Sequence, residues 1–128
     1  MSRILVVEDN IVNLELVVAL LEEQGYQVLT AETADAGLDL AASERPDLIL
    51  MDLHLPGMTG YEATQCLKAN PVTARIPVVA ITASAMRGDA ARAQAVGCDA
   101  YLTKPLDARA FHETLHRFLR RGARVGEG

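Results

Sequence analysis

Five polar residues with complementary chemistry each come directly after a short apolar or strand-forming run. They are the carboxylates of Glu8, Asp9 and Asp52, the hydroxyl of Thr82 and the ammonium of Lys104. Three carboxylates that lie close together repel one another, and burial raises their pKa values unless a cation is present. One lysine cannot neutralise three such charges. The set therefore predicts a site for a hard divalent cation, and Mg²⁺ held by one or two carboxylates, waters and a phosphate suits it.

Phosphoryl transfer is the reaction that this set could support. Asp52 is the candidate nucleophile, because it ends the run expected to be a central strand and because carboxylates form covalent acyl phosphates. The reaction needs little from a protein beyond alignment and charge compensation on the phosphoryl oxygens. Mg²⁺, the ammonium of Lys104 and the hydroxyl of Thr82 are the types of group that supply this compensation.

Five short strands are predicted to position these residues. The apolar, β-branched runs that predict them are Ile4–Val7, Gln27–Ala31, Leu48–Met51, Pro77–Ile81 and Ala100–Thr103. A helical pattern follows each run, over Ile11–Gln24, Ala34–Ser43, Tyr61–Ala69, Gly88–Val96 and Asp107–Arg121. Strands that alternate with helices indicate an α/β fold of five βα units, with a parallel sheet between two helical layers. In such sheets function lies outside the carboxyl ends of the strands, where all five polar residues fall.

Composition and charge narrow the class of protein. The chain of 128 residues carries a formal net charge of −5, which disfavours direct nucleic-acid binding. No run of about 18 apolar residues is present, so no membrane span is expected, and the N-terminus does not read as a signal peptide. Cys66 and Cys98 show no metal-binding spacing and are interpreted as free, mostly buried thiols in a reducing cytoplasm.

The ordered motifs resemble the receiver domains of two-component response regulators. They read VEDN at residues 7–10, MDLHLP at 51–56, ITA at 81–83 and TKP at 103–105. The likeness extends from Arg3 to about Arg121 and is close to single-domain receivers of the DivK type, including the EDNxxN start and the MRGD stretch at residues 86–89. It implies a doubly wound, CheY-like or flavodoxin-like sheet with strand order 2-1-3-4-5. We accordingly expect a receiver domain over residues 1–121 and a short flexible tail over residues 122–128.

The resemblance also implies roles for individual residues. Asp52 would be phosphorylated, and Thr82 and Lys104 would contact the phosphoryl group. Glu8, Asp9 and Asp52 would hold Mg²⁺ together with the backbone carbonyl of His54. Thr82 and Tyr101 would form the switch, with the tyrosine moving inward as the threonine engages the phosphate. The Lys104-Pro105 bond would be cis, although sequence alone would predict trans for it.

Two positions depart from the pattern of many relatives. His54 lies two residues beyond the phosphoacceptor, and Ser84 lies two residues beyond Thr82. In the family these positions border the path of the water that hydrolyses the acyl phosphate. The lifetime of the phosphorylated form and the choice of partner therefore depend on them.

Several function classes remain to be compared. The leading one is a response regulator that takes its phosphoryl group from a histidine kinase or phosphotransfer protein. Its output would be a contact with another protein, through the face formed by residues 88–96, 100–103 and 107–121. The alternative on the same fold is a phosphorylation-independent adaptor. A haloacid-dehalogenase-like phosphatase would need an aspartate where His54 stands, and a dinucleotide-binding oxidoreductase would need GxGxxG after the first strand. The chain is therefore not expected to be an enzyme beyond weak self-catalysis.

Overall fold

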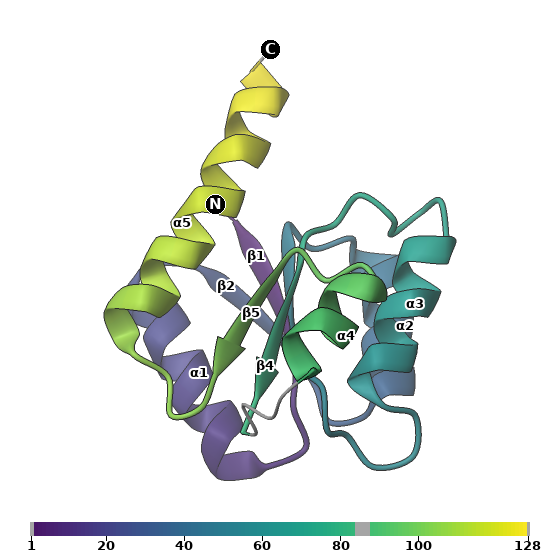
Figure 1. Ribbon diagram of the computed structural model, residues 1–128. Coiled ribbons are helices and arrows are strands. Elements are labelled where there is room, and N and C mark those ends of the chain that lie inside the picture. The colour runs from purple at the N-terminus through teal and green to yellow at the C-terminus, as the bar shows by residue number, and fades with distance from the viewer. Residues whose placement is uncertain (1, 84–87, 128) are drawn as a thin grey trace.

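The computed structural model describes residues 2–83 and 88–127, which form one five-stranded parallel sheet flanked by helices (Figure 1). The strands are β1 (Arg3–Val7), β2 (Gln27–Ala31), β3 (Leu48–Asp52), β4 (Val78–Thr82) and β5 (Ala100–Thr103). Their order across the sheet is β2-β1-β3-β4-β5, and each neighbouring pair is parallel. The predicted fold class and strand order are confirmed.

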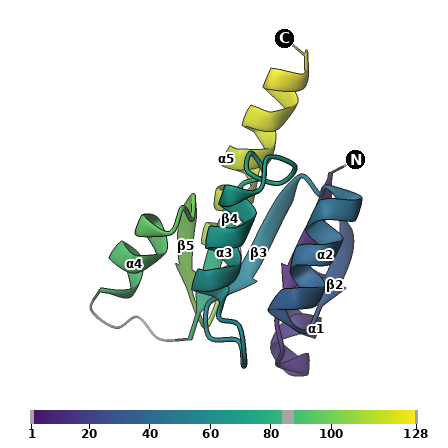
Figure 2. The same cartoon turned by 90° about the vertical axis from the view of Figure 1, so that its right-hand side faces the viewer.

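Helices cover both faces of the sheet (Figures 1 and 2). They are α1 (Ile11–Glu23), α2 (Ala34–Glu44), α3 (Gly60–Ala69), α4 (Asp89–Ala95) and α5 (Ala108–Glu127). Buried residues of α1 and α5 pack on one face, and those of α2 and α3 pack on the other. A smaller core between α3 and α4, around Tyr61 and Ala93, extends the second layer. The arrangement is therefore doubly wound.

The inner strands β1 and β3 are buried on both faces because successive side chains enter opposite helical layers. Ile4 and Val6 belong to the core with α1 and α5, whereas Leu5 and Val7 belong to the core with α2 and α3. All five residues of β3 are buried in the same way. This is the physical reason for continuous apolar runs in place of an alternating pattern.

Side chains cap the beginnings of α1, α2 and α3, and the Asp107 carboxylate does the same for α5. The Asn10 side chain caps α1 by accepting a hydrogen bond from the amide of Asn13. Thr33 caps α2 in the same manner. At α3, Thr59 and Glu62 form a reciprocal capping box, in which each side chain accepts from the other residue's backbone amide. The box matters because α3 begins beside the end of β3.

Replacing Thr59 by alanine is expected to lower the free energy of unfolding by about 1 kcal/mol, because the Glu62 amide in the first turn of α3 loses its hydroxyl acceptor. Urea denaturation followed by circular dichroism measures the change. Glu62→Gln is the matched control, since glutamine can still accept from the Thr59 amide. An unchanged midpoint in Thr59→Ala would show that the box contributes nothing to stability.

The helix boundaries differ from the sequence prediction mainly at the last helix. It was expected to end at Arg121, but α5 continues to Glu127, and its final turns extend beyond the sheet (Figure 1). The predicted end of this helix is therefore wrong, while the flexibility predicted for residues 122–128 stays a prediction. Ser84 and the Met86–Arg87 part of the MRGD stretch lie outside the described residues. Among the residues described, no helix is both long and apolar enough to cross a membrane.

Both cysteines are free thiols, as expected. The prediction that they are mostly buried is wrong for Cys66, which is exposed. Cys66 lies on the solvent side of α3, whereas the next residue, Leu67, faces the core. Cys98 is partly buried beside α3 and α4.

Candidate functional site

The register of the parallel strands brings the predicted site residues to one edge of the sheet. Val7 pairs with Met51, so Glu8 and Asp52 follow side by side at the ends of β1 and β3. Thr82 at the end of β4 pairs with Thr103 at the end of β5. Lys104, the next residue after β5, therefore lies beside the end of β4. The Lys104 amide donates a hydrogen bond to the carbonyl of Thr82 at 2.8 Å, which extends this ladder.

Lys104 joins two of the buried carboxylates. Its Nζ lies 2.6 Å from Oε1 of Glu8 and 3.8 Å from Oδ2 of Asp52. Glu8 is 3% exposed and Asp52 is 6% exposed, so both charges have been largely removed from water. A buried carboxylate of this kind is stable only with hydrogen bonds or a cation beside it. The lysine supplies this compensation for Glu8 at close range and for Asp52 at longer range.

The negative charge at this edge exceeds what Lys104 supplies. Glu8, Asp9 and Asp52 each offer a carboxylate oxygen within 4.8 Å of the other two, and Asp9 is exposed to solvent. Burial, and then the neighbouring Asp52 carboxyl group, raise the pKa of Glu8, against the opposing effect of Lys104. These are the oxygen ligands that Mg²⁺ prefers, two of them buried and one open to water. The donor set therefore fits a hydrated divalent ion.

The loop after β3 holds the Asp52 side chain in place. The amide of His54 donates to Oδ1 of Asp52 at 3.0 Å. The His54 side chain is exposed, and the edge of its ring faces the Tyr61 ring with a centroid distance of 6.4 Å. Its imidazole therefore lies at the surface of the site, while its backbone contacts the candidate nucleophile.

The remaining predicted residues lie on β4 and β5. Thr82 is fully buried at the end of β4, and Tyr101 is partly buried on β5. Burial and then the negative charge of Asp89 raise the pKa of Tyr101, so its hydroxyl stays protonated. The Lys104-Pro105 bond is cis, as the resemblance implied. The switch role of Thr82 and Tyr101 stays a prediction.

Gly60 is a site residue that the sequence analysis missed. A Cβ atom at this position would lie 2.2 Å from the Asp52 carbonyl oxygen and 2.7 Å from the Leu53 Cα. Its amide donates to the Leu53 carbonyl at 3.1 Å. The first turn of α3 can therefore rest directly on the backbone of the candidate nucleophile. The Thr59-to-Glu62 capping signature in the sequence could have located this helix start.

A second missed group connects α3 with α4. The guanidinium carbon of Arg92 lies 3.9 Å from the centre of the buried Tyr61 ring. The Tyr61 hydroxyl donates to Oδ1 of Asp89 over a long 3.4 Å. No local sequence signal links Tyr61 with the residues of α4, because Tyr61 and Asp89 are 28 positions apart in the chain.

Comparison with known proteins decides the family. A model of the response regulator receiver domain matches residues 4–116 of this chain. The chain belongs to the response regulator receiver family. Its relatives include the polar-differentiation response regulator DivK of Brucella anthropi, 43% identical over 118 residues that cover 92% of this chain and 96% of that protein. DivK of Brucella ovis is 42% identical over the same shares of both chains.

Solved receiver structures share the fold. The receiver domain of a sensor histidine kinase from Pseudomonas aeruginosa is 36% identical with a TM-score of 0.86, covers 92% of this chain and 97% of its own, and has a magnesium ion coordinated in its active-site cleft. A CheY-like receiver protein from Methanospirillum hungatei is 31% identical with a TM-score of 0.87 over 100% of this chain and 99% of its own. As a member of this family, the chain is a signalling module rather than a conventional enzyme.

Proposed function

We propose that this receiver acts in a two-component phosphorelay, in which Asp52 takes a phosphoryl group in a Mg²⁺-dependent reaction. The observation that carries the proposal is the edge of the sheet itself. Asp52 lies there 6% exposed, with the Lys104 ammonium and two further carboxylates close by. A nucleophilic carboxylate, a fixed cation and a set of oxygen ligands are together what phosphoryl transfer to an aspartate requires.

The donor is a phosphohistidine of a histidine kinase or phosphotransfer protein. An oxygen of the Asp52 carboxylate forms the new bond to phosphorus while the bond between phosphorus and the imidazole nitrogen breaks, and the imidazole leaves with the electron pair. The His54 amide holds one Asp52 oxygen at 3.0 Å, which leaves the other as the attacking atom. Lys104 and Thr82 stabilise the negative charge on the transferred group. Hydrolysis of the acyl phosphate later restores the carboxylate.

Glu8, Asp9, Asp52 and the backbone carbonyl of His54 are the residues that would hold Mg²⁺. Bound there, the ion would offset the charge of the acidic cluster and of the phosphoryl oxygens. The fit rests on the three carboxylates, whose oxygens approach within 4.8 Å of one another.

The output we propose is a contact with another protein in the cytoplasm, rather than with nucleic acid or a membrane. The face formed by α4, β5 and α5 is the proposed docking surface, with Thr82 and Tyr101 as the switch. α4 is suited to respond, because Ala93 is its one buried residue and helices with few buried contacts rearrange at low cost. The net charge of −5 supports a protein partner over a nucleic acid.

The experiment that tests the function is intact mass spectrometry after incubation with acetyl phosphate. A gain of one phosphoryl group with Mg²⁺, and none with EDTA, is the expected result. No gain with acetyl phosphate or with a phosphorylated histidine kinase would reject the proposal in favour of a phosphorylation-independent adaptor. The acidic cluster would then need another explanation.

Replacing Asp9 by asparagine is expected to weaken Mg²⁺ binding by about tenfold to a hundredfold, because one unit charge is removed within a few ångströms of the ion. Isothermal titration calorimetry measures the affinity. Folding stability is expected to change little, since Asp9 is exposed. Asp39→Asn, an exposed acidic position on α2, is the matched control. Equal affinities of the two variants would exclude Asp9 from the metal site.

A further inference from the structure

The two ends of α4 are held very differently. At its beginning, Gly88 lies in the left-handed region with φ +94°, and no side chain caps the helix. The contact of Asp89 with the Tyr61 hydroxyl is long at 3.4 Å, and Oδ2 of Asp89 has no hydrogen-bond partner among the described residues. Among the described residues, the first turn of α4 is therefore held by this long hydrogen bond and by the contact of Arg92 with the Tyr61 ring, without a helix cap.

The end of α4 is closed by a complete Schellman motif. The Gly97 amide donates to the Gln94 carbonyl at 3.0 Å, and the Cys98 amide donates to the Ala93 carbonyl at 3.0 Å. Gly97 has φ +105°, a conformation that glycine adopts without strain. The last carbonyls of α4 are thus satisfied by the turn that leads to β5.

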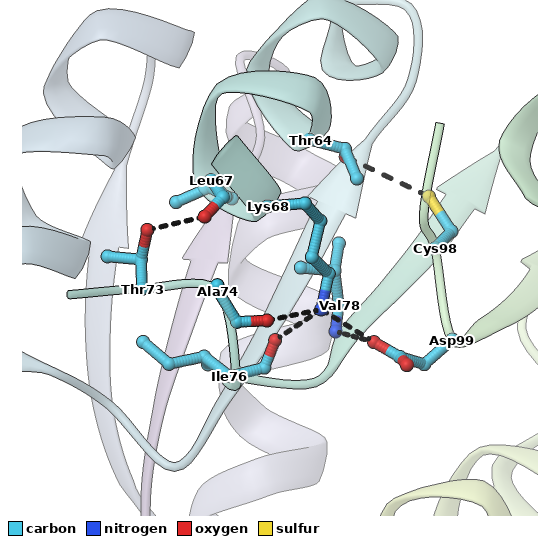
Figure 3. A network of polar contacts seen from close by, with 9 residues as sticks. All are labelled: Thr64, Leu67, Lys68, Thr73, Ala74, Ile76, Val78, Cys98 and Asp99. Carbon is cyan, nitrogen blue, oxygen red and sulfur yellow. Dashed lines mark hydrogen bonds and ion pairs between the residues drawn. The ribbon is translucent and has the colours of Figure 1, made fainter. Parts of the chain in front are cut away.

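Asp99 attaches this turn to the beginning of β4. Its amide donates to the Val78 carbonyl at 2.8 Å, and its Oδ2 accepts from the Val78 amide at 2.8 Å. Figure 3 shows that Lys68 of α3 reaches the same carboxylate. The distance from Nζ of Lys68 to Oδ2 of Asp99 is 3.1 Å. Asp99, which follows the turn after α4, is therefore bonded to both α3 and β4.

Lys68 gathers three acceptors from different parts of the chain. Besides Asp99, its ammonium donates to the carbonyls of Ile76 at 2.9 Å and Ala74 at 3.3 Å (Figure 3). Its aliphatic stem lies over the turn, because a Cβ on Gly97 would come within 2.9 Å of the Lys68 Cγ. An exposed ion pair alone contributes little to stability. Here the lysine also donates hydrogen bonds to two loop carbonyls, and its side chain is only 22% exposed.

We propose that the base clip, defined as Lys68, Val78 and Asp99, fixes the C-terminal end of α4, so that the response to phosphorylation is confined to the beginning of this helix. Lys68 is then a positioning residue of the switch. It lies on α3, at the opposite edge of the sheet from Asp52, and takes no part in phosphoryl transfer. The role in switching rests on the proposed function, whereas the anchoring of α4 does not.

Cys98 supplies a built-in reporter for the clip. Its thiol contacts the Thr64 hydroxyl at 3.8 Å, immediately beside the clip (Figure 3). Burial raises the pKa of the Cys98 thiol, so it reacts slowly while the turn stays closed. In a Cys66→Ser background, which removes the exposed thiol, maleimide labelling reports opening of this turn.

The test measures Cys98 labelling with and without Mg²⁺ and beryllofluoride, used as a phosphoryl mimic. The Lys68→Met variant is expected to label about tenfold faster than the parent, because three acceptors lose their donor and the turn opens locally more often. Its labelling rate is expected to change further with the mimic, whereas the parent rate stays within twofold. Asp99→Asn is also expected to raise the Cys98 labelling rate. In the double variant, the rate is expected to rise by less than the product of the two single-variant factors, because both substitutions disrupt the same contact. Arg75→Met, which removes an exposed cation of the same loop, is the control.

Two outcomes would overturn the clip: equal labelling of Lys68→Met and Arg75→Met, or a severalfold change of the parent rate with the mimic. Intact mass of the same samples after acetyl phosphate separates this question from the proposed function. If no phosphoryl group is gained, the proposed function fails, while the labelling of Lys68→Met without any mimic still decides whether the clip anchors α4.

Discussion

The Asp52→Asn variant is expected to gain no phosphoryl group under conditions in which the unaltered chain gains one. An amide cannot form the acyl phosphate that a carboxylate forms. The expected loss is therefore complete rather than partial. Intact mass spectrometry with acetyl phosphate and Mg²⁺ measures it directly, with Asp39→Asn as an exposed control that keeps full phosphorylation.

The same variant is expected to be at least as stable as the unaltered chain in the absence of Mg²⁺. Asp52 is buried next to Glu8 and helps to raise the pKa of that residue, so the two acidic groups destabilise each other. The compensating contact with Lys104 is long, at 3.8 Å. A urea midpoint equal to or above that of the unaltered chain is the predicted result. A phosphorylated Asp52→Asn chain would instead place the acceptor on another residue.

The Gly60→Ala variant is expected to lose about 3 kcal/mol or more of unfolding free energy, the upper end of what overpacking costs. The new methyl carbon would lie 2.2 Å from the Asp52 carbonyl oxygen, and a backbone atom cannot yield as a flexible side chain can. Either α3 moves away from the sheet or the end of β3 shifts. Because Asp52 is on that end, slower phosphorylation is expected along with the lower stability.

Urea denaturation of Gly60→Ala is best compared with Gly25→Ala. Gly25 has φ +86° and open space around it, so its substitution tests backbone conformation alone, at roughly 1 kcal/mol. The Gly60→Ala substitution tests the close packing of α3 against the end of β3. If the two variants lose the same stability, the contact between α3 and the Asp52 backbone is less tight than the structure indicates.

Much of the fold could be predicted because local pattern and tertiary burial agree. The run Leu48–Met51 is apolar throughout, and the structure buries β3 on both faces. Asn10 and Gly25 bracket the first helix in the sequence, and they take the N-cap and left-handed conformations that are typical of these residue types at helix ends. The conformation of such residues is determined by neighbours a few positions away in the chain. A single sequence is therefore enough to predict it.

The candidate site was predictable for a different reason. Glu8, Asp52 and Lys104 are far apart in the chain, but each follows the end of a strand, and parallel strands bring those ends together. The closer approach of Lys104 to Glu8 than to Asp52 could not be predicted, because it depends on side-chain conformation.

The sequence could not predict contacts that depend on how closely the helices pack against the sheet. Glycine within a helix has low helix propensity, yet a Cβ at Gly37 would lie 2.7 Å from a Val7 methyl group, so this glycine lets α2 approach the sheet. Gly60 has the same kind of role at α3. The ion pair of Lys68 with Asp99 spans 31 positions and leaves no local pattern. The end of α5 was predicted too early at Arg121, although a glycine follows there as a typical helix stop, because the helix continues through Gly122 to Glu127.

The complete burial of β3 has a consequence for how long the site persists. Backbone amides of a strand covered on both faces exchange with solvent only when the whole domain unfolds, whereas frayed segments exchange by local opening. Asp52 belongs to this strand, so its position is lost only in global unfolding events. The working lifetime of the phosphoacceptor is then the lifetime of the native state, while segments with few buried contacts can open many times within that period.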